Sequence, residues 1–238
     1  MSSENYFKKE NMDIYLKELA REFRKRNGKS VPAEIILIGG AAVLINYGFR
    51  DSTYDMDAII EASSSMIDAI NTVGYKYGLP KGWLNSDFEN TTSYTPKIKQ
   101  YSKYYHTFSN VITFRTVTGE YLIAMKLMAG RQYKYDLSDI IGILLAHEKD
   151  ENPLTLETIK QAVCNLYGSY EALPVNSRTF IEQALMKQNY ESLYLQVREE
   201  EQLNKAILLD FQDKYPNITN QDNVNDIIET IKKRQNSK

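Results

Sequence analysis

The 238-residue chain predicts an α/β fold followed by a C-terminal helical module. Short β-branched apolar runs alternate with helix-like segments only in the first half of the chain. From Gly119 onward, apolar residues recur at helical spacing and no run has the character of a strand. These two observations predict a core over residues 1–118 and a helical domain over residues 119–238.

The elements of the first half follow one another closely. Residues 13–26 carry one apolar stripe at helical spacing, and Asn27-Gly28 is a typical helix end. Residues 34–38 form a short apolar run closed by two glycines, which predicts a buried strand entering a tight turn. The remaining segments predict a helix at 41–47, a strand at 55–60, a helix at 63–77 and a strand at 107–117. Later helices are expected near 175–188, 192–211 and 224–234.

Composition excludes several classes of protein. One Cys and two His exclude a disulfide framework, a zinc finger and a His-based metal cage, so a bound metal would be Mg²⁺ or Mn²⁺ on carboxylates. The formal net charge of −2 gives no general basic field for nucleic acid. No apolar run reaches the roughly 20 residues that cross a bilayer, and the N-terminus has no signal core. We therefore expect a cytoplasmic protein without membrane contact.

A glycine pair follows the first predicted strand. Glycine accepts a positive φ, so Gly39-Gly40 permits a sharp turn into the following helix. The free N–H groups and the dipole of a helix that starts there can bind phosphate. The alternative is a compact turn without a ligand.

Two aspartates open the second predicted strand. Side chains alternate along a strand, so Asp55 and Asp57 project to one face. Two carboxylates this close repel each other unless a cation lies between them, and a divalent metal meets that need. A solvated pair at the start of a strand is the alternative.

The order of strand, Gly39-Gly40, helix and Asp55-Met56-Asp57 resembles the nucleotidyltransferase superfamily of the polymerase-β type, and looks closest to the AbiEii-like bacterial enzymes and toxins. The resemblance implies a nucleotidyltransferase-like core with a mixed sheet. It also implies that the glycines bind the nucleotide, and that Asp55 and Asp57 bind the metal and act in catalysis.

A second segment looks like the later motif of the same group. Lys126 precedes Ala129-Gly130-Arg131, and Asp136 and Asp139 follow. The resemblance implies that Lys126 and Arg131 contact the nucleotide, and that Asp136 or Asp139 completes the site. The residues by themselves also allow Asp136 and Asp139 to cap a helix and Lys126 to be a surface lysine.

The third carboxylate of such enzymes usually lies on a later strand. The predicted strand at 107–117 has no acid, and the nearest acids are Asp87, Glu89 and Glu120. Either Asp136 or Asp139 takes this role, or the site is incomplete.

Residues 90–119 form a second candidate surface, because they include lysines and tyrosines but no acid. Such a segment can contact RNA, or it can be a surface loop with an edge strand that lysines protect from pairing.

Together these features predict a metal-dependent enzyme that moves a nucleoside monophosphate from a nucleoside triphosphate to an acceptor. The acceptor could be tRNA, a protein or a small molecule, and the protein could act in a toxin–antitoxin pair with an antitoxin partner. The alternative is an inactive module of the same fold that binds a nucleotide or a partner.

Overall fold

A computed structural model describes residues 7–220 and 223–236 of the chain. These residues form a mixed α/β structure, with a five-stranded sheet followed by a long helical part, which confirms the predicted fold class. The strands are β1 (Ala33–Leu37), β2 (Met56–Glu61), β3 (Leu84–Asn85), β4 (Ser102–Phe108) and β5 (Ile112–Val117). The α-helices are α1 (Lys9–Asn27), α2 (Gly39–Asn46), α3 (Ser65–Tyr77), α4 (Gly119–Ala129), α5 (Asp136–Lys149), α6 (Leu156–Tyr167), α7 (Val175–Lys187), α8 (Tyr190–Lys214) and α9 (Val224–Asn236).

The sheet has the order β3-β2-β1-β5-β4. Strand β1 lies in the centre, antiparallel to β2 and parallel to β5. Leu37 at the end of β1 pairs with Ala58 near the start of β2, and the Ile38 N–H donates to the Asp57 carbonyl at 3.0 Å. This register places the beginning of α2 beside Asp57.

The expectation of a single strand over residues 107–117 is wrong. Strands β4 and β5 form an antiparallel hairpin in that region, and β4 begins at Ser102. Ser109 and Asn110 have φ values of 54° and 52°, which is the left-handed conformation required at both central positions of a type I′ turn. The pair Ser109-Asn110 indicates a turn, but the β-branched residues around it favour one continuous strand, so the turn was not predicted.

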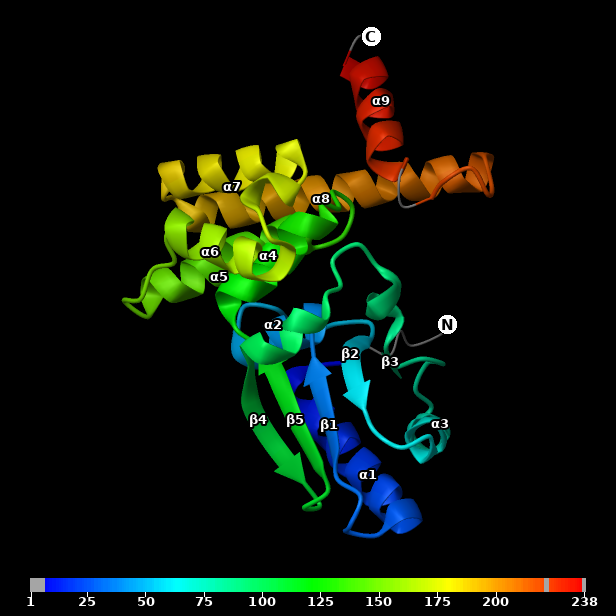
Figure 1. The fold of residues 1–238 in the computed structure, drawn as a ribbon. Coiled ribbons are helices and arrows are strands. Elements are labelled where there is room, and N and C mark those ends of the chain that lie inside the picture. Colours follow the sequence, from blue (N-terminus) through cyan, green and yellow to red (C-terminus); the bar gives the residue numbers. More distant parts are fainter. Residues whose placement is uncertain (1–6, 221–222, 237–238) are drawn as a thin grey trace.

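Two apolar clusters cover the two faces of the sheet. Helices α1 and α3 pack on one face through residues such as Leu16, Phe23 and Val73. Ile36 and Ile59 face the other side, where the core continues into the helical part. Figure 1 shows this arrangement, with the helical part stacked on one end of the sheet and α9 projecting away from it.

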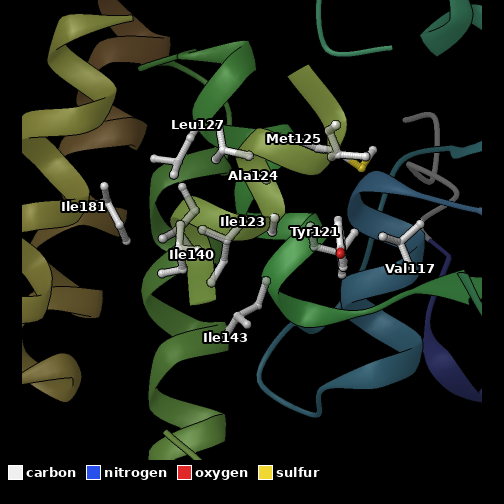
Figure 2. Close-up of a cluster of buried hydrophobic side chains, with 14 of the residues drawn as sticks. Val117, Tyr121, Ile123, Ala124, Met125, Leu127, Ile140, Ile143 and Ile181 are labelled. Atoms are coloured by element: carbon white, nitrogen blue, oxygen red, sulfur yellow. The ribbon is translucent and has the colours of Figure 1, made fainter. Parts of the chain in front are cut away.

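Helix α4 connects the sheet to the later helices. Its residues from Tyr121 to Leu127 are all buried, so the helix is apolar around most of its circumference. Figure 2 shows why: Tyr121 lies toward Val117 and the sheet, while other side chains face Ile140 and Ile181 of the neighbouring helices. Over the described residues, no helix has the length and apolar character needed to cross a bilayer. The division into domains at residue 118 stays a prediction.

Candidate nucleotide and metal site

One cavity of about 700 Å³ lies between the sheet and the helical part. It brings together segments that are far apart in the sequence: the start of α2, the start of β2, the end of α4 and the start of α5. All eight site residues predicted from the sequence line it, namely Gly39, Gly40, Asp55, Asp57, Lys126, Arg131, Asp136 and Asp139. The two sequence motifs therefore form one site.

The glycine pair forms the first turn of α2, two residues earlier than the predicted start of that helix. Gly39 has φ +55°, and a Cβ atom there would lie 3.3 Å from Asp57 Oδ2. A Cβ atom on Gly40 would lie 2.6 Å from Thr53 Oγ1 and 3.0 Å from the guanidinium of Arg50. Gly39 thus permits the left-handed conformation, and Gly40 gives Arg50 room to cross the helix start. No side chain caps this end of α2, so its N–H groups can bind an anion.

Asp55 and Asp57 lie on either side of the buried Met56. Asp55 is exposed just before β2, and Asp57 is half-buried within it. Burial raises the pKa of Asp57, and the charge of Asp55 raises it further. Neither carboxylate forms a hydrogen bond or ion pair with another described residue. This is a charge arrangement that a bound cation would stabilise.

The carboxylates fit Mg²⁺ or Mn²⁺ because they are hard oxygen ligands on a rigid element. Within residues 7–220 and 223–236, no three Asp, Glu, His or Cys side chains gather into a metal cluster. The described part of the chain therefore places the pair Asp55 and Asp57 at this position. Mg²⁺ commonly binds in this way, with water and substrate phosphates as its other ligands.

The second motif has the opposite character, because its charges neutralise one another. Lys126 is only 6% exposed, and its Nζ lies 2.9 Å from Asp136 Oδ1 and 2.8 Å from Asp139 Oδ2. Arg131 binds Asp136 through two hydrogen bonds, and Arg50 Nη1 lies 2.5 Å from Asp139 Oδ2. Lys126 is therefore not the surface lysine that the sequence also allowed.

The opposite charges also shift the pKa values of Lys126 and Asp136. Burial alone would lower the pKa of Lys126, but Asp136 and Asp139 outweigh it and raise this pKa. Burial would likewise raise the pKa of Asp136, but Lys126 and Arg131 hold it well below its usual range. Lys126 and Asp136 are therefore both ionised at neutral pH.

Helix α5 begins at Asp136, yet its first N–H groups are bound by a residue from a different helix. Glu201 of α8 accepts hydrogen bonds from Leu137 N at 2.8 Å and Ser138 N at 3.2 Å, as well as from the Ser138 hydroxyl. Glu201 is 2% exposed, and burial raises its pKa to about 7. This cap leaves Asp136 and Asp139 available for the ion pairs with Lys126, Arg131 and Arg50.

Four further charged residues, which were not predicted from the sequence as site residues, line the cavity: Arg50, Asp87, Lys134 and Lys205. Asp87 follows β3, which pairs with β2 at Asp57↔Asn85, and its charge contributes to the raised pKa of Asp57. The side chain of Lys134 is exposed, but partial desolvation of its ammonium group and the charge of Arg131 lower its pKa. The position of Asp87 could not be predicted because β3 has only two residues.

The uncapped start of α2, the carboxylate pair and the buried Lys126 thus line one cavity beside a mixed sheet. A family model described as "Nucleotidyltransferase of unknown function (DUF6036)" matches residues 14–182, well over half of the chain. The chain belongs to this nucleotidyltransferase family. No curated protein and no solved structure matches it.

Proposed function

We propose that the protein is a metal-dependent enzyme that transfers a nucleoside monophosphate from a nucleoside triphosphate to an acceptor hydroxyl. The observation that carries this proposal is the convergence of Gly39, Gly40, Asp55 and Asp57 with the cationic loop after α4 in one cavity. Family membership supports the class of enzyme. The metal, the nucleotide and the acceptor belong to the proposal.

The triphosphate would lie between the start of α2 and the loop after α4. The α2 N–H groups offer hydrogen bonds and a positive dipole end. Lys134 is exposed and forms no ion pair with the described residues, so its ammonium group can bind a phosphate. Arg131 remains partly exposed while it holds Asp136. Lys134 and Arg131 would thus balance the charge of the phosphates.

Asp55 and Asp57 would hold Mg²⁺ or Mn²⁺. The bound metal would neutralise triphosphate oxygens and stabilise the charge that develops at the reacting phosphorus. The acceptor oxygen attacks the α-phosphorus in line and forms the new O–P bond. The bond to the β-phosphate breaks, pyrophosphate leaves with the electron pair, and the hydroxyl proton is released.

The direct roles predicted for Lys126, Asp136 and Asp139 stay predictions. The geometry favours positioning, because each is buried and already bound to an opposite charge. Asp136 orients Arg131, and Asp139 holds Arg50 beside Gly40. In this proposal the second motif orders the cations around the phosphates.

The acceptor and the biological setting also belong to the proposal. The acceptor could be tRNA, a protein or a small molecule, and the proposed antitoxin partner rests on the resemblance of the sequence to AbiEii-like proteins. The segment 90–119 gives an RNA acceptor little support, because Lys99 pairs with Glu61, Arg115 binds Ser102, and Tyr101 packs against the core. Tyr104 on the edge strand β4 is 60% exposed and remains the most accessible aromatic side chain of the segment.

Radiolabel transfer from each of the four α-labelled nucleoside triphosphates tests the proposal. The acceptors are total tRNA, the protein itself and a panel of small hydroxyl compounds, with and without Mg²⁺. We expect transfer by the wild type that requires the metal and is lost in the Asp55→Ala/Asp57→Ala variant. Equal signals from the wild type and the variant in every arm would refute the proposal.

A second candidate is a nucleotide-binding protein without transfer activity. The observation that favours it is that the described carboxylates gather at the site as a pair and not as a cluster of three. Calorimetry distinguishes the two candidates. Metal-dependent nucleotide binding by the wild type, with no transfer to any acceptor, would support the second.

A further inference from the structure

Helices α8 and α9 follow residue 182, where the family match ends, and α8 lines the cavity with residues that include Lys205 and Leu208. Helix α9 packs against α8 and projects away from the sheet (Figure 1). The segment Gly130–Tyr135 connects α4 to α5, has no helical or strand structure, and forms hydrogen bonds with both helices. This loop presents Arg131 and Lys134 to the cavity.

Two asparagines bind the backbone of this loop. Asn225 of α9 donates to the Gly130 carbonyl at 2.9 Å and accepts from the Gln132 N–H at 3.4 Å. Asn204 of α8 donates to the Gln132 carbonyl at 2.9 Å. These hydrogen bonds pair backbone polar groups of Gly130 and Gln132, the two neighbours of Arg131. The backbone of Arg131 is therefore held in position from both sides.

An apolar contact holds the other half of the loop. Leu208 of α8 packs with Val224 and Ile228 of α9, and Tyr133 of the loop packs against this group. The cluster is separate from the two cores that cover the sheet. Helix α9 therefore contacts the loop and α8, while none of its residues 224–234 lines the cavity.

We propose that α8 and α9 form a clamp that holds segment Gly130–Tyr135 in position to bind the phosphates, with Asn225 as a positioning residue. The inference rests on the proposed function for the identity of the ligand. A six-residue loop without regular structure loses conformational entropy when it is ordered, and a loop ordered beforehand avoids that loss on binding. An unclamped loop is competent only part of the time, and the apparent Kd rises in proportion.

The test uses three full-length variants. Asn225→Ala removes both hydrogen bonds of Asn225 to the loop, and Asn225→Asp keeps the acceptor for Gln132 while losing the donor to Gly130. Thr230→Ala is the matched control, because Thr230 is an exposed residue on the same helix. Magnesium tripolyphosphate is the probe, since it reports phosphate binding without a base, and calorimetry gives its Kd.

Hydrogen exchange of residues 130–135 is the second measurement. We expect Asn225→Ala to speed exchange in this segment and to raise the Kd for tripolyphosphate about tenfold. Asn225→Asp should have a smaller effect of the same kind, and Thr230→Ala should match the wild type. A role of Asn225 in global stability alone would lower Tm without this selective change at residues 130–135.

Three outcomes would overturn the inference: unchanged exchange in Asn225→Ala, faster exchange with unchanged tripolyphosphate affinity, or an equal effect of Thr230→Ala. If Asn225→Ala does not fold, the same criteria apply to Asn225→Asp. A wild type that does not bind magnesium tripolyphosphate refutes the proposed function and the ligand named here. The exchange result then still decides whether α9 orders the loop.

Discussion

The segment from Gly39 to Asp57, called here the open segment, and the segment from Lys126 to Asp139, called the closed segment, line the same cavity. They differ in whether their carboxylates are paired with cations. In the first, Asp55 and Asp57 form no ion pair with the described residues. In the second, Lys126 and its two aspartates are buried and bound to one another. Two neighbouring like charges without a counter-ion destabilise the free protein but can bind a cation, whereas buried ion pairs hold the side chains that form them in fixed positions.

The substitution with the largest expected effect is in the open segment. Asp57→Asn should reduce nucleotide transfer about a thousandfold, or ~4 kcal/mol in activation free energy, because it removes one of the two carboxylates proposed to bind the metal. The free energy of unfolding should stay equal or rise, since the repulsion between Asp55 and Asp57 disappears. Transfer assays and urea unfolding measure the two effects, with the exposed Asp226→Asn as control. A variant that loses stability and activity together would contradict the comparison.

The second prediction tests the closed segment. Lys126→Ala leaves Asp136 and Asp139 buried without one of their cations, so the free energy of unfolding should fall by about 3 kcal/mol. Lys149→Ala is the matched control, because Lys149 pairs with Glu191 on the surface and its loss should cost less than about 1 kcal/mol. Urea unfolding at neutral pH compares them. Equal destabilisation by the two substitutions would show that the buried pairs are no more important than a surface pair.

The same contrast explains how much could be predicted from the sequence. Asp55 and Asp57 are local features, since strand alternation and a glycine turn are encoded by neighbouring residues. The ion pairs of the second segment depend on Arg50, which lies 89 residues before Asp139, and its cap comes from Glu201, 63 residues after Ser138. Such long-range partners leave no periodic signal in the sequence. For the same reason the resemblance placed Lys126 near the nucleotide without showing that its charge is already neutralised.

The third prediction concerns the titration of Glu201, the cap behind the closed segment. The pKa of Glu201 is raised from 4.5 to about 7, chiefly by burial, so the folded protein binds more protons than the unfolded chain between these values. The contribution of Glu201 protonation to the free energy of unfolding is therefore largest below pH 4.5, and it is lost as the pH rises through 7.

Glu201→Gln keeps an acceptor for the N–H groups of Leu137 and Ser138 but does not titrate. The difference in unfolding free energy, wild type minus variant, should fall by on the order of 2 kcal/mol between pH 5 and pH 8. Denaturant unfolding across this range measures the difference. The contributions of all other titrating groups are the same in both proteins and cancel in the subtraction. Parallel stability curves would show that Glu201 keeps an ordinary pKa.

The smallest expected effect is at Gly39 in the open segment, where both the backbone conformation and the nearby Asp57 side chain disfavour a Cβ atom. Its φ of +55° is unfavourable for alanine, and a Cβ atom would lie 3.3 Å from Asp57 Oδ2. Gly39→Ala should therefore lower the free energy of unfolding by about 1 kcal/mol, and should weaken magnesium tripolyphosphate binding about fivefold by displacing Asp57. Gly48→Ala is the control, because a Cβ atom there meets open space. If Gly39→Ala loses stability but keeps its affinity for the probe, then Gly39 serves the turn alone, and the close approach of Asp57 to α2 has no part in binding.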